Sequence, residues 1–361
     1  MKSSFDVIVI GGGHAAIEAA AASARLGADT LLLTMNMDHI AQMSCNPAIG
    51  GIAKGQVVRE IDALGGLMGK VTDASMIQFR MLNRKKGPAV WSPRAQCDKV
   101  CYQRAMKYEL EKIPNLMIHQ AEAMAIITEN GRVTGICSSF GDKYLCKSLV
   151  IAPGTFMTGK LHFGLKNFDG GRAGDYPSNS LPFSLREKLG LRMGRLKTGT
   201  PPRILAKTID FSGMARQESE TADEYFSFFT EDKALPQTTK KHTPCFLTRT
   251  TKETAEIVKK NLDRSPLYAG YISGIGTRYC PSFEDKVVKF PHHETHIIYL
   301  EPEGEFTEEY YLNGISTSLP TDVQRSMLKT LPGLENAEIS RYAYAIEYDF
   351  VFPDQLYRTL A

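Results

Sequence analysis

Residues Asp6-Val-Ile-Val-Ile-Gly-Gly-Gly-His-Ala-Ala16 decide the fold of this chain. The run Asp6–Ile10 is short and ends in four apolar residues, which predicts a strand buried on both faces of a parallel sheet. Gly11, Gly13 and Ala16 then match the G-x-G-x-x-G/A pattern. Glycine lets the backbone approach a pyrophosphate closely, and the N-terminus of the next helix supplies partial positive charge and free N–H groups. We therefore expect a dinucleotide site here; a glycine-rich turn without a ligand is the alternative.

The residues after the turn complete a strand–helix–strand unit. Ile17–Leu26 is alanine-rich and predicts a thin helix, Gly27 caps its C-terminus, and Thr30–Leu33 predicts the next strand. The acid that usually binds the ribose about 20 residues after the glycines is missing, because Thr34 ends the strand and the first acid is Asp38. A neutral side chain, Asp38 from an unusual angle, or the backbone would hold the ribose. The pattern supports an adenine dinucleotide without distinguishing FAD from NAD.

Composition places the chain among ordinary soluble proteins. It has 361 residues, 43% of them hydrophobic and 23% charged, which suggests about two domains. No apolar run approaches the ~20 residues of a membrane span, and the N-terminus enters a strand with no room for a signal peptide. Seven cysteines, an odd number, favour a reducing compartment. We therefore expect a cytoplasmic protein with no membrane association.

Changes in amino-acid composition along the chain predict how the domains are arranged. From about residue 160, Gly, Pro, Ser and Thr become dense, as in ordered loops that line sites. We expect an α/β fold with a doubly wound, Rossmann-like first domain over residues 1–203. Residues 204–340 would form an inserted α+β domain, and residues 341–361 would return to the first domain. The chain stops there without the further strand and helix that normally finish such a fold.

Charge is concentrated rather than large. The net charge of +3 does not by itself indicate a nucleic-acid binder. The stretch from Arg186 to Lys207 nevertheless carries seven basic residues against one acid, Glu187. A basic face of this kind can follow a phosphate backbone, and a solvated protein surface is the alternative.

Two cysteines are candidates for chemistry. Cys280 lies close in sequence to Arg278 and Lys286, which can lower the pKa of a thiol, and to Glu284–Asp285, which offer proton-transfer groups or structural partners. Cys45 lies in a separate loop rich in Pro and Gly. The alternative for each is a buried cysteine that packs as a small hydrophobic residue.

We expect no metal site. His292, His293 and His296 could supply ligands from one helical face, but Pro291 and the apolar run Ile297–Leu300 around them predict a strand. No H-E-x-x-H motif is present.

Several stretches of unusual composition are spread almost from end to end of the chain. They are Gly11–His14, Gln42–Gly51, Asp62–Met68, Gly87–Val90, Gly170–Asp175, Gly194–Arg203, Asn261–Pro266, Arg278–Pro281, Asn313–Pro320 and Tyr344–Phe350. In these stretches the chain resembles the MnmG (GidA) family of FAD-dependent tRNA uridine-modifying enzymes.

This resemblance implies a cytoplasmic flavoprotein, a homodimer, that acts on the wobble uridine U34 of tRNA together with the GTPase MnmE. In that family NADH reduces FAD, and methylenetetrahydrofolate supplies one carbon. Glycine or ammonia completes a 5-carboxymethylaminomethyl or 5-aminomethyl group at C5 of the uracil.

The resemblance also implies roles for individual residues. The two cysteines of the tRNA chemistry fall on Cys45 and Cys280. The implied FAD contacts are Gly11, Gly12, Gly13, His14, Ala15, Ala16, Ala123 and Ser178. The implied nicotinamide segment runs from Gly276 to Phe290 and includes Gly276, Thr277, Arg278, Tyr279, Pro281, Glu284 and Asp285.

Two departures from the family pattern matter. Ala16 replaces the usual glycine, which the general fingerprint tolerates. The family also continues past residue 361 with a glycine-rich flavin-contacting segment and a helical C-terminal domain that binds tRNA and the partner, so we expect a shortened chain. The rival functions are a flavin oxidoreductase acting on a small molecule and an inactive remnant that binds partners. A related group of folate- and FAD-dependent tRNA methyltransferases shares the chemistry.

The chemistry explains why thiols are needed. C5 of uracil is a poor nucleophile, and addition of a thiolate to C6 turns the ring into an enolate whose C5 can attack an electrophilic carbon. We expect Cys280 or Cys45 to add in this way, with Arg278 or Lys286 stabilising the thiolate and the enolate. We favour Cys280, because charged residues surround it in the sequence.

Overall fold

The computed structural model describes residues 2–220, 225–230, 243–277 and 280–360. Its N-terminal sheet has the strand order β6-β2-β1-β9-β8-β7, parallel from β6 to β9 and antiparallel from β9 to β7. The strands are β1 (Ser4–Ile10), β2 (Thr30–Thr34), β6 (Leu116–Gln120), β7 (Ala123–Glu129), β8 (Arg132–Ser138) and β9 (Lys143–Ile151). The buried parallel strand expected at Asp6–Ile10 is therefore confirmed.

Apolar side chains of β1 and β2 pack on both faces of this sheet, which explains their unbroken apolar runs. On one face, Val9 and Leu32 join a core formed with helices α1 (His14–Arg25) and α4 (Lys99–Glu111). On the other face, Ile8 and Leu31 pack with helix α5 (Ser180–Leu189). Helices on both faces of a largely parallel sheet are typical of the Rossmann-like architecture.

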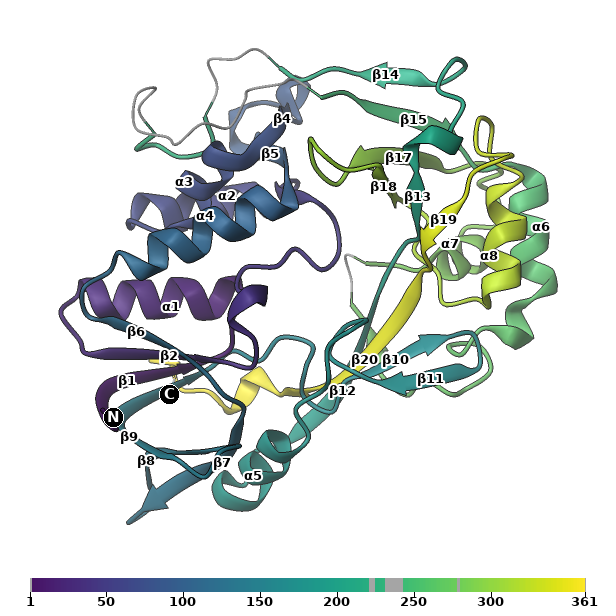
Figure 1. Cartoon of the computed structure of the whole chain (residues 1–361). Coiled ribbons are helices and arrows are strands. Elements are labelled where there is room, and N and C mark those ends of the chain that lie inside the picture. Colours follow the sequence, from purple (N-terminus) through teal and green to yellow (C-terminus); the bar gives the residue numbers. More distant parts are fainter. Residues whose placement is uncertain (1, 221–224, 231–242, 278–279, 361) are drawn as a thin grey trace.

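A smaller layer covers α4 and α1 (Figure 1). It consists of a three-stranded antiparallel sheet, β3 (Ala48–Gly50), β5 (Ser92–Cys97) and β4 (Met76–Leu82), with helices α2 (Gly55–Ala63) and α3 (Met68–Ser75). The chain also forms short 3-10 helices: η1 (Met37–His39), η2 (Arg84–Lys86), η3 (Pro88–Val90), η4 (Ala206–Thr208), η5 (Leu262–Arg264) and η6 (Pro353–Gln355).

The remaining strands form two further sheets. One has the order β11-β10-β20-β12-β16, with β10 (Lys160–Phe163), β11 (Lys166–Asp169), β12 (Met193–Thr200), β16 (Ile275–Gly276) and β20 (Tyr344–Val351). The other is antiparallel with the order β14-β15-β17-β18-β13-β19, made of β13 (Arg203–Leu205), β14 (Ala215–Gln217), β15 (Cys245–Arg249), β17 (Ile297–Pro302), β18 (Glu309–Asn313) and β19 (Ile339–Arg341). Helices α6 (Lys252–Lys260), α7 (Phe283–Lys289) and α8 (Thr321–Leu328) lie along one side of the antiparallel sheet (Figure 1). Their apolar residues form one core with those of the sheet.

The middle of the chain is connected to the rest through strand pairing. β12 and β20 pair along their whole length, from Met193–Val351 to Thr200–Tyr344. β16 then adds to the edge of β12 through the pair Leu196–Ile275. The mixed α/β class is confirmed, while the division into residues 1–203, 204–340 and 341–361 stays a prediction. Among the described residues, no helix combines the length and the apolar character that a membrane crossing requires.

Candidate functional site

A pocket opens at the carboxyl ends of β1 and β2, where the glycine turn joins α1. Four groups of residues line it: the turn itself, the end of β2 with the loop after it, the start of β7, and the loops that follow β9 and β11. They are Ile10–His14, Leu33–Asn36, His39, Gln42, Ser44, Ala121–Ala123, Ala152–Phe156, Arg172, Asp175, Tyr176, Ser178 and Leu181. Ligands of open α/β sheets bind at this edge of the parallel strands.

The three glycines of the turn serve different purposes. Gly11 has φ of +123°, and a Cβ there would lie 2.3 Å from the carbonyl oxygen of Ala152. A Cβ on Gly12 would lie 2.6 Å from Oγ1 of Thr34. A Cβ on Gly13 would meet no described protein atom within 4 Å. Packing therefore requires glycine at positions 11 and 12, whereas a ligand approaching the start of α1 is what would require it at position 13.

The start of α1 is free to bind an anion. The N-cap residue is Gly13, so no side chain caps the helix, and its first turn contains no acid. The first N–H groups of a helix have no partner within the helix, and the helix dipole favours negative charge there. The turn can therefore hold a pyrophosphate in the expected way.

Unpartnered polar atoms around the pocket fit a polar cofactor. Within the described part of the chain, Nε2 of His14, Oε1 of Gln42 and Oγ of Ser178 are buried and lack a hydrogen-bond partner. Buried polar atoms without a partner are costly, so a ligand that supplied partners here would be stabilised. Burial lowers the pKa of His14 to about 4, so its imidazole is neutral at physiological pH and can accept or donate one hydrogen bond.

Most of the implied FAD contacts lie together in this pocket. Gly11, Gly12, Gly13, His14, Ala123 and Ser178 all line it. Ala15 is exposed and Ala16 is fully buried against the sheet, and neither contributes to the lining. The small side chain at position 16 serves the packing of α1 on the sheet, the role of the third position of the fingerprint.

The missing ribose acid now has candidate replacements. Asp38 pairs with Lys107 at 3.3 Å, has a largely exposed side chain and does not line the pocket. Thr34, Asn36 and Glu122 line it instead. Glu122 was not recognisable from the sequence, because it lies between β6 and β7, far along the chain from the glycine turn.

The implied nicotinamide residues lie outside this pocket. Gly276 is in the edge strand β16, and the backbone N–H of Thr277 donates to the carbonyl of Lys197 at 3.1 Å. Arg278 and Tyr279 lie outside the described residues. Pro281 is exposed at the start of the turn into α7.

The two acids of this segment have structural partners. Oε1 of Glu284 accepts hydrogen bonds from the backbone N–H and the hydroxyl of Ser318, at 3.0 Å and 3.1 Å. Asp285 pairs with Lys289 at 2.9 Å and accepts a hydrogen bond from the hydroxyl of Ser282. Both contacts favour the structural alternative for these acids over proton transfer.

The structure brings Cys45 and Cys280 together. Both thiols donate to the carbonyl oxygen of Gly199, Cys45 Sγ at 3.7 Å and Cys280 Sγ at 3.6 Å. Ser44, next to Cys45, lines the pocket. The pocket and the two thiols are therefore neighbours. Burial lowers the pKa of Lys286, and a negative charge on Cys280 opposes that effect. The ammonium group of Lys286 itself donates a hydrogen bond to the carbonyl of Gly314 at 2.7 Å.

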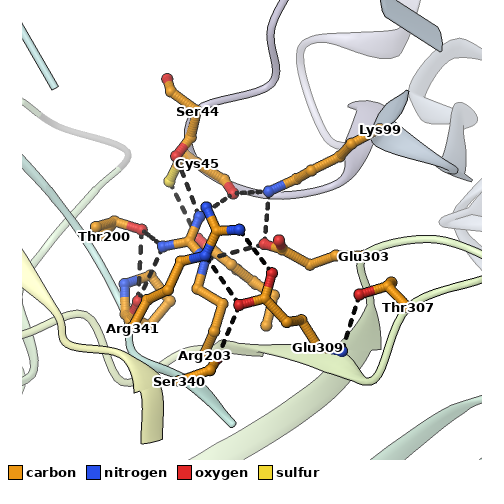
Figure 2. Close-up of polar contacts among 12 residues, drawn as sticks. Ser44, Cys45, Lys99, Thr200, Arg203, Glu303, Thr307, Glu309, Ser340 and Arg341 are labelled. Carbon is orange, nitrogen blue, oxygen red and sulfur yellow. Dashed lines mark hydrogen bonds and ion pairs between the residues drawn. The ribbon is translucent and has the colours of Figure 1, made fainter. Parts of the chain in front are cut away.

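Arg203 holds the loop that carries Cys45 (Figure 2). Its guanidinium makes five hydrogen bonds, which uses all five N–H groups of an arginine. The acceptors are Oε1 of Glu303, Oγ1 of Thr200 and the carbonyls of Pro201, Ser44 and Cys45. Arg203 is only 4% exposed. No sequence signal pointed to this role, apart from the position of Arg203 at the end of the stretch Gly194–Arg203.

Lys99 and Glu303 complete this cluster (Figure 2). Nζ of Lys99 donates to the carbonyl of Cys45 at 3.0 Å and pairs with Oε1 of Glu303 at 2.5 Å. Burial lowers the pKa of Lys99 to about 8, opposed by the charge of Glu303 and reinforced by that of Arg203. Two cations and one carboxylate therefore surround the backbone of Cys45, a polar environment buried within the protein.

The basic stretch from Arg186 to Lys207 is partly buried and partly paired with acids, and its role in binding phosphates stays a prediction. Lys197 and Arg203 are buried. Arg186 and Arg195 each pair with Asp349 at 2.9 Å, while Arg192 pairs with Asp354. Acids near the end of the chain therefore pair with three of the seven basic residues of this stretch. In the part of the chain that the structure describes, no cluster of His, Cys, Asp or Glu side chains could hold a metal ion.

Comparison with known proteins gives a consistent family match. The family described as "Glucose inhibited division protein A" matches residues 6–361. The "tRNA uridine 5-carboxymethylaminomethyl modification enzyme MnmG" of Thermodesulfovibrio yellowstonii is 57% identical over 359 residues, 99% of this chain and 57% of the relative. The enzyme of the same name from Protochlamydia amoebophila is 54% identical, over 98% of this chain and 55% of the relative.

Solved structures agree. Aquifex aeolicus GidA superimposes with a TM-score of 0.91 in its form II crystal, at 49% identity, covering 99% of this chain and 57% of that chain. In its form I crystal the TM-score is 0.92 at 52% identity, and the match covers 99% of this chain and 60% of that chain. The chain thus spans little more than half the length of the relatives that it matches.

Proposed function

The chain belongs to the MnmG (GidA) family, and we propose that it carries the cofactor pocket and the two reactive thiols of an enzyme that modifies U34 of tRNA. The observation that supports this most is the meeting of Cys45 and Cys280 at the carbonyl of Gly199, beside the pocket that Ser44 lines. The names of the relatives give a carboxymethylaminomethyl group at C5 of uridine as the product. An aminomethyl group would follow from the same chemistry with ammonia in place of glycine.

FAD is the cofactor that suits the pocket. We assign its pyrophosphate to Gly11–Gly13 and the start of α1, and its ribose to Thr34, Asn36 or Glu122. The unpartnered atoms of His14, Gln42 and Ser178 would bind its polar groups. Bound FAD would supply two-electron redox chemistry, with NADH as its reductant.

The thiols would activate the uracil ring. In our proposal the thiolate of Cys280 adds to C6, and the electrons of the C5–C6 double bond move to O4 as an enolate. C5 then attacks the carbon of an iminium that the one-carbon unit of methylenetetrahydrofolate would form with glycine or ammonia as tetrahydrofolate is released, and the iminium nitrogen takes up the electron pair. Cys45 Sγ removes the C5 proton, and the Cys280 thiolate leaves as the double bond re-forms. Lys286 and Arg278 would stabilise the negative charge at Cys280 and on the ring.

The partners follow from family membership rather than from the fold. We propose that the protein works as a cytoplasmic homodimer with the GTPase MnmE, and that Gly276–Phe290 contributes to nicotinamide binding. The domain division at residues 203 and 340 belongs to the same proposal.

A reconstituted assay tests the function. The protein, mixed with FAD, NADH, methylenetetrahydrofolate, glycine or ammonium, MnmE and a tRNA with unmodified U34, should convert that nucleoside to the modified form seen by mass spectrometry. NADH oxidation with a soluble acceptor and no change of U34 would instead indicate a small-molecule oxidoreductase. A protein that stays colourless with excess FAD would indicate an inactive remnant.

A further inference from the structure

Tyr311 lies directly against one of the two thiols. This residue is in the middle of β18 and is only 4% exposed. Its hydroxyl is 3.1 Å from Cys45 Sγ, and its ring lies 5.1 Å from the guanidinium carbon of Arg203. A buried hydroxyl needs a partner. In the described part of the chain, this hydroxyl has the sulfur of Cys45 as its hydrogen-bond partner.

The direction of this hydrogen bond follows from counting protons. The single proton of the Cys45 thiol points to the carbonyl of Gly199, so the sulfur is left as an acceptor. The phenol therefore donates to the sulfur. Burial raises the pKa of Tyr311 well above its usual range, and the charge of Cys45 raises it further, so the phenol keeps its proton when the thiol loses its own.

The other charged groups near Cys45 act on its backbone rather than on its sulfur. Arg203 from β13 and Lys99 from α4 donate to its carbonyl oxygen, and Glu303, at the end of β17, binds both cations. Cys280 reaches the region through Gly199. Besides the carbonyl of Gly199, which accepts from the thiol, the phenol of Tyr311 is the polar group that the described hydrogen bonds direct at the sulfur itself.

We propose that Tyr311 is a positioning residue for Cys45, whose hydroxyl donates to the sulfur, stabilises the thiolate and holds it in one orientation. This rests on the proposed function, in which Cys45 acts as a thiolate beside the substrate ring. A hydrogen bond to a charged acceptor is stronger than one to a neutral acceptor, so the contact favours the thiolate over the thiol.

Alkylation kinetics test this without tRNA or FAD. Iodoacetamide would be applied across a range of pH, and modification of each cysteine followed by peptide mass spectrometry. In Tyr311→Phe we expect the profile for Cys45 to move up by about one pH unit. The rate at neutral pH should fall only about threefold, because a less stabilised thiolate is also more nucleophilic.

Two controls come from the chain itself. Cys280 shares Gly199 with Cys45 but has no described contact with Tyr311, so its profile should not move. Tyr310→Phe removes the hydroxyl of the neighbouring residue on the same strand. The ring of Tyr310 packs against Phe211, with the ring centres 5.5 Å apart, so this variant should leave the alkylation profiles of both cysteines unchanged. An unchanged Cys45 profile in Tyr311→Phe, or an equal shift of both cysteines, would overturn the proposal.

A second replacement covers the case in which Tyr311→Phe does not fold. Site-specific replacement of Tyr311 by 3-fluorotyrosine keeps the ring and the hydroxyl but makes it a stronger donor. The Cys45 profile should then move to lower pH, and a profile that does not move contradicts the proposal. Because these readouts are thiol reactivities, they can succeed even if tRNA modification fails, and the two failures remain distinguishable.

Discussion

Cys45 and Cys280 meet at a single atom, the carbonyl oxygen of Gly199, although they lie far apart in the sequence. Their sulfurs can therefore be no further apart than the sum of 3.7 Å and 3.6 Å. A short bifunctional thiol reagent such as dibromobimane should bridge them in the folded protein and become fluorescent. Cys45→Ala and Cys280→Ala should each abolish that fluorescence, whereas Cys137→Ala should not. Bridging that persists in either of the first two variants would show that other cysteines react.

The glycines of the turn should separate folding from cofactor binding. Gly13→Ala adds a Cβ to the space reserved for the pyrophosphate, so we expect the FAD dissociation constant to rise at least about tenfold. Its free energy of unfolding should change by less than about 1 kcal/mol, because φ is −83° there. Gly11→Ala should instead lower the free energy of unfolding by about 3 kcal/mol or more, since its Cβ would overlap the carbonyl of Ala152. Flavin fluorescence titration and urea unfolding measure the two effects, and equal behaviour of the two variants would contradict the assignment.

Arg203 should be irreplaceable by lysine. Arg203→Lys keeps the charge but cannot satisfy five acceptors, so buried carbonyls lose partners and the free energy of unfolding should fall by about 2–4 kcal/mol. Arg341→Lys is the matched control, because Arg341 makes a two-bond pair with Glu309 on an exposed edge. Arg341→Lys should lower the free energy of unfolding by less than about 1 kcal/mol. Denaturant titrations of the two variants decide between these outcomes, and a similar loss in both would argue against the central role of Arg203.

His14 should make the cofactor-free protein sensitive to acid. Its pKa is about 4 in the folded protein against an ordinary value of 6.5, so the unfolded chain takes up its proton first as the pH falls. Its contribution to stability is therefore lost between pH 6.5 and about 4, by at most about 3 kcal/mol. His14→Gln cannot take up this proton, and its stability should fall less over that range. Parallel stability curves for the two proteins would contradict the burial of a neutral imidazole.

The sequence predicted those parts of the fold and the site that depend on local patterns. The apolar run of β1, the glycine turn and α1 follow one another in the chain, so their periodicity and spacing define the pocket's base. An Asn-Gly pair is another local signal, typical of a hairpin turn, and Asn130 and Gly131 have the positive φ, 51° and 73°, that this turn requires. Cys45 and Cys280 were each candidates from their local sequence, but only the resemblance to a family joined them, since no local pattern does.

Long-range partners could not be predicted. Tyr311 and Lys99 contact Cys45, and Glu303 pairs with Lys99, from three separate parts of the chain that only the tertiary fold brings together. The ion pairs within the basic stretch were hidden for the same reason, because strand pairing places Asp349 on β20 opposite Arg195 on β12. The charges that favoured Cys280 in the sequence proved to be partly structural, as the contacts of Glu284 with Ser318 show.

Addition of a thiol to the uracil ring is the central step of the proposed reaction, and tRNA containing 5-fluorouridine at position 34 tests it directly. After addition at C6 and attack by C5, fluorine takes the place of the proton that must leave, so the protein should remain attached to the RNA. We predict a complex that survives denaturing electrophoresis, maps to Cys280 and is absent from Cys280→Ser but present in Cys137→Ser. Normal modification of U34 by Cys280→Ser, or a complex of undiminished yield in that variant, would contradict the account.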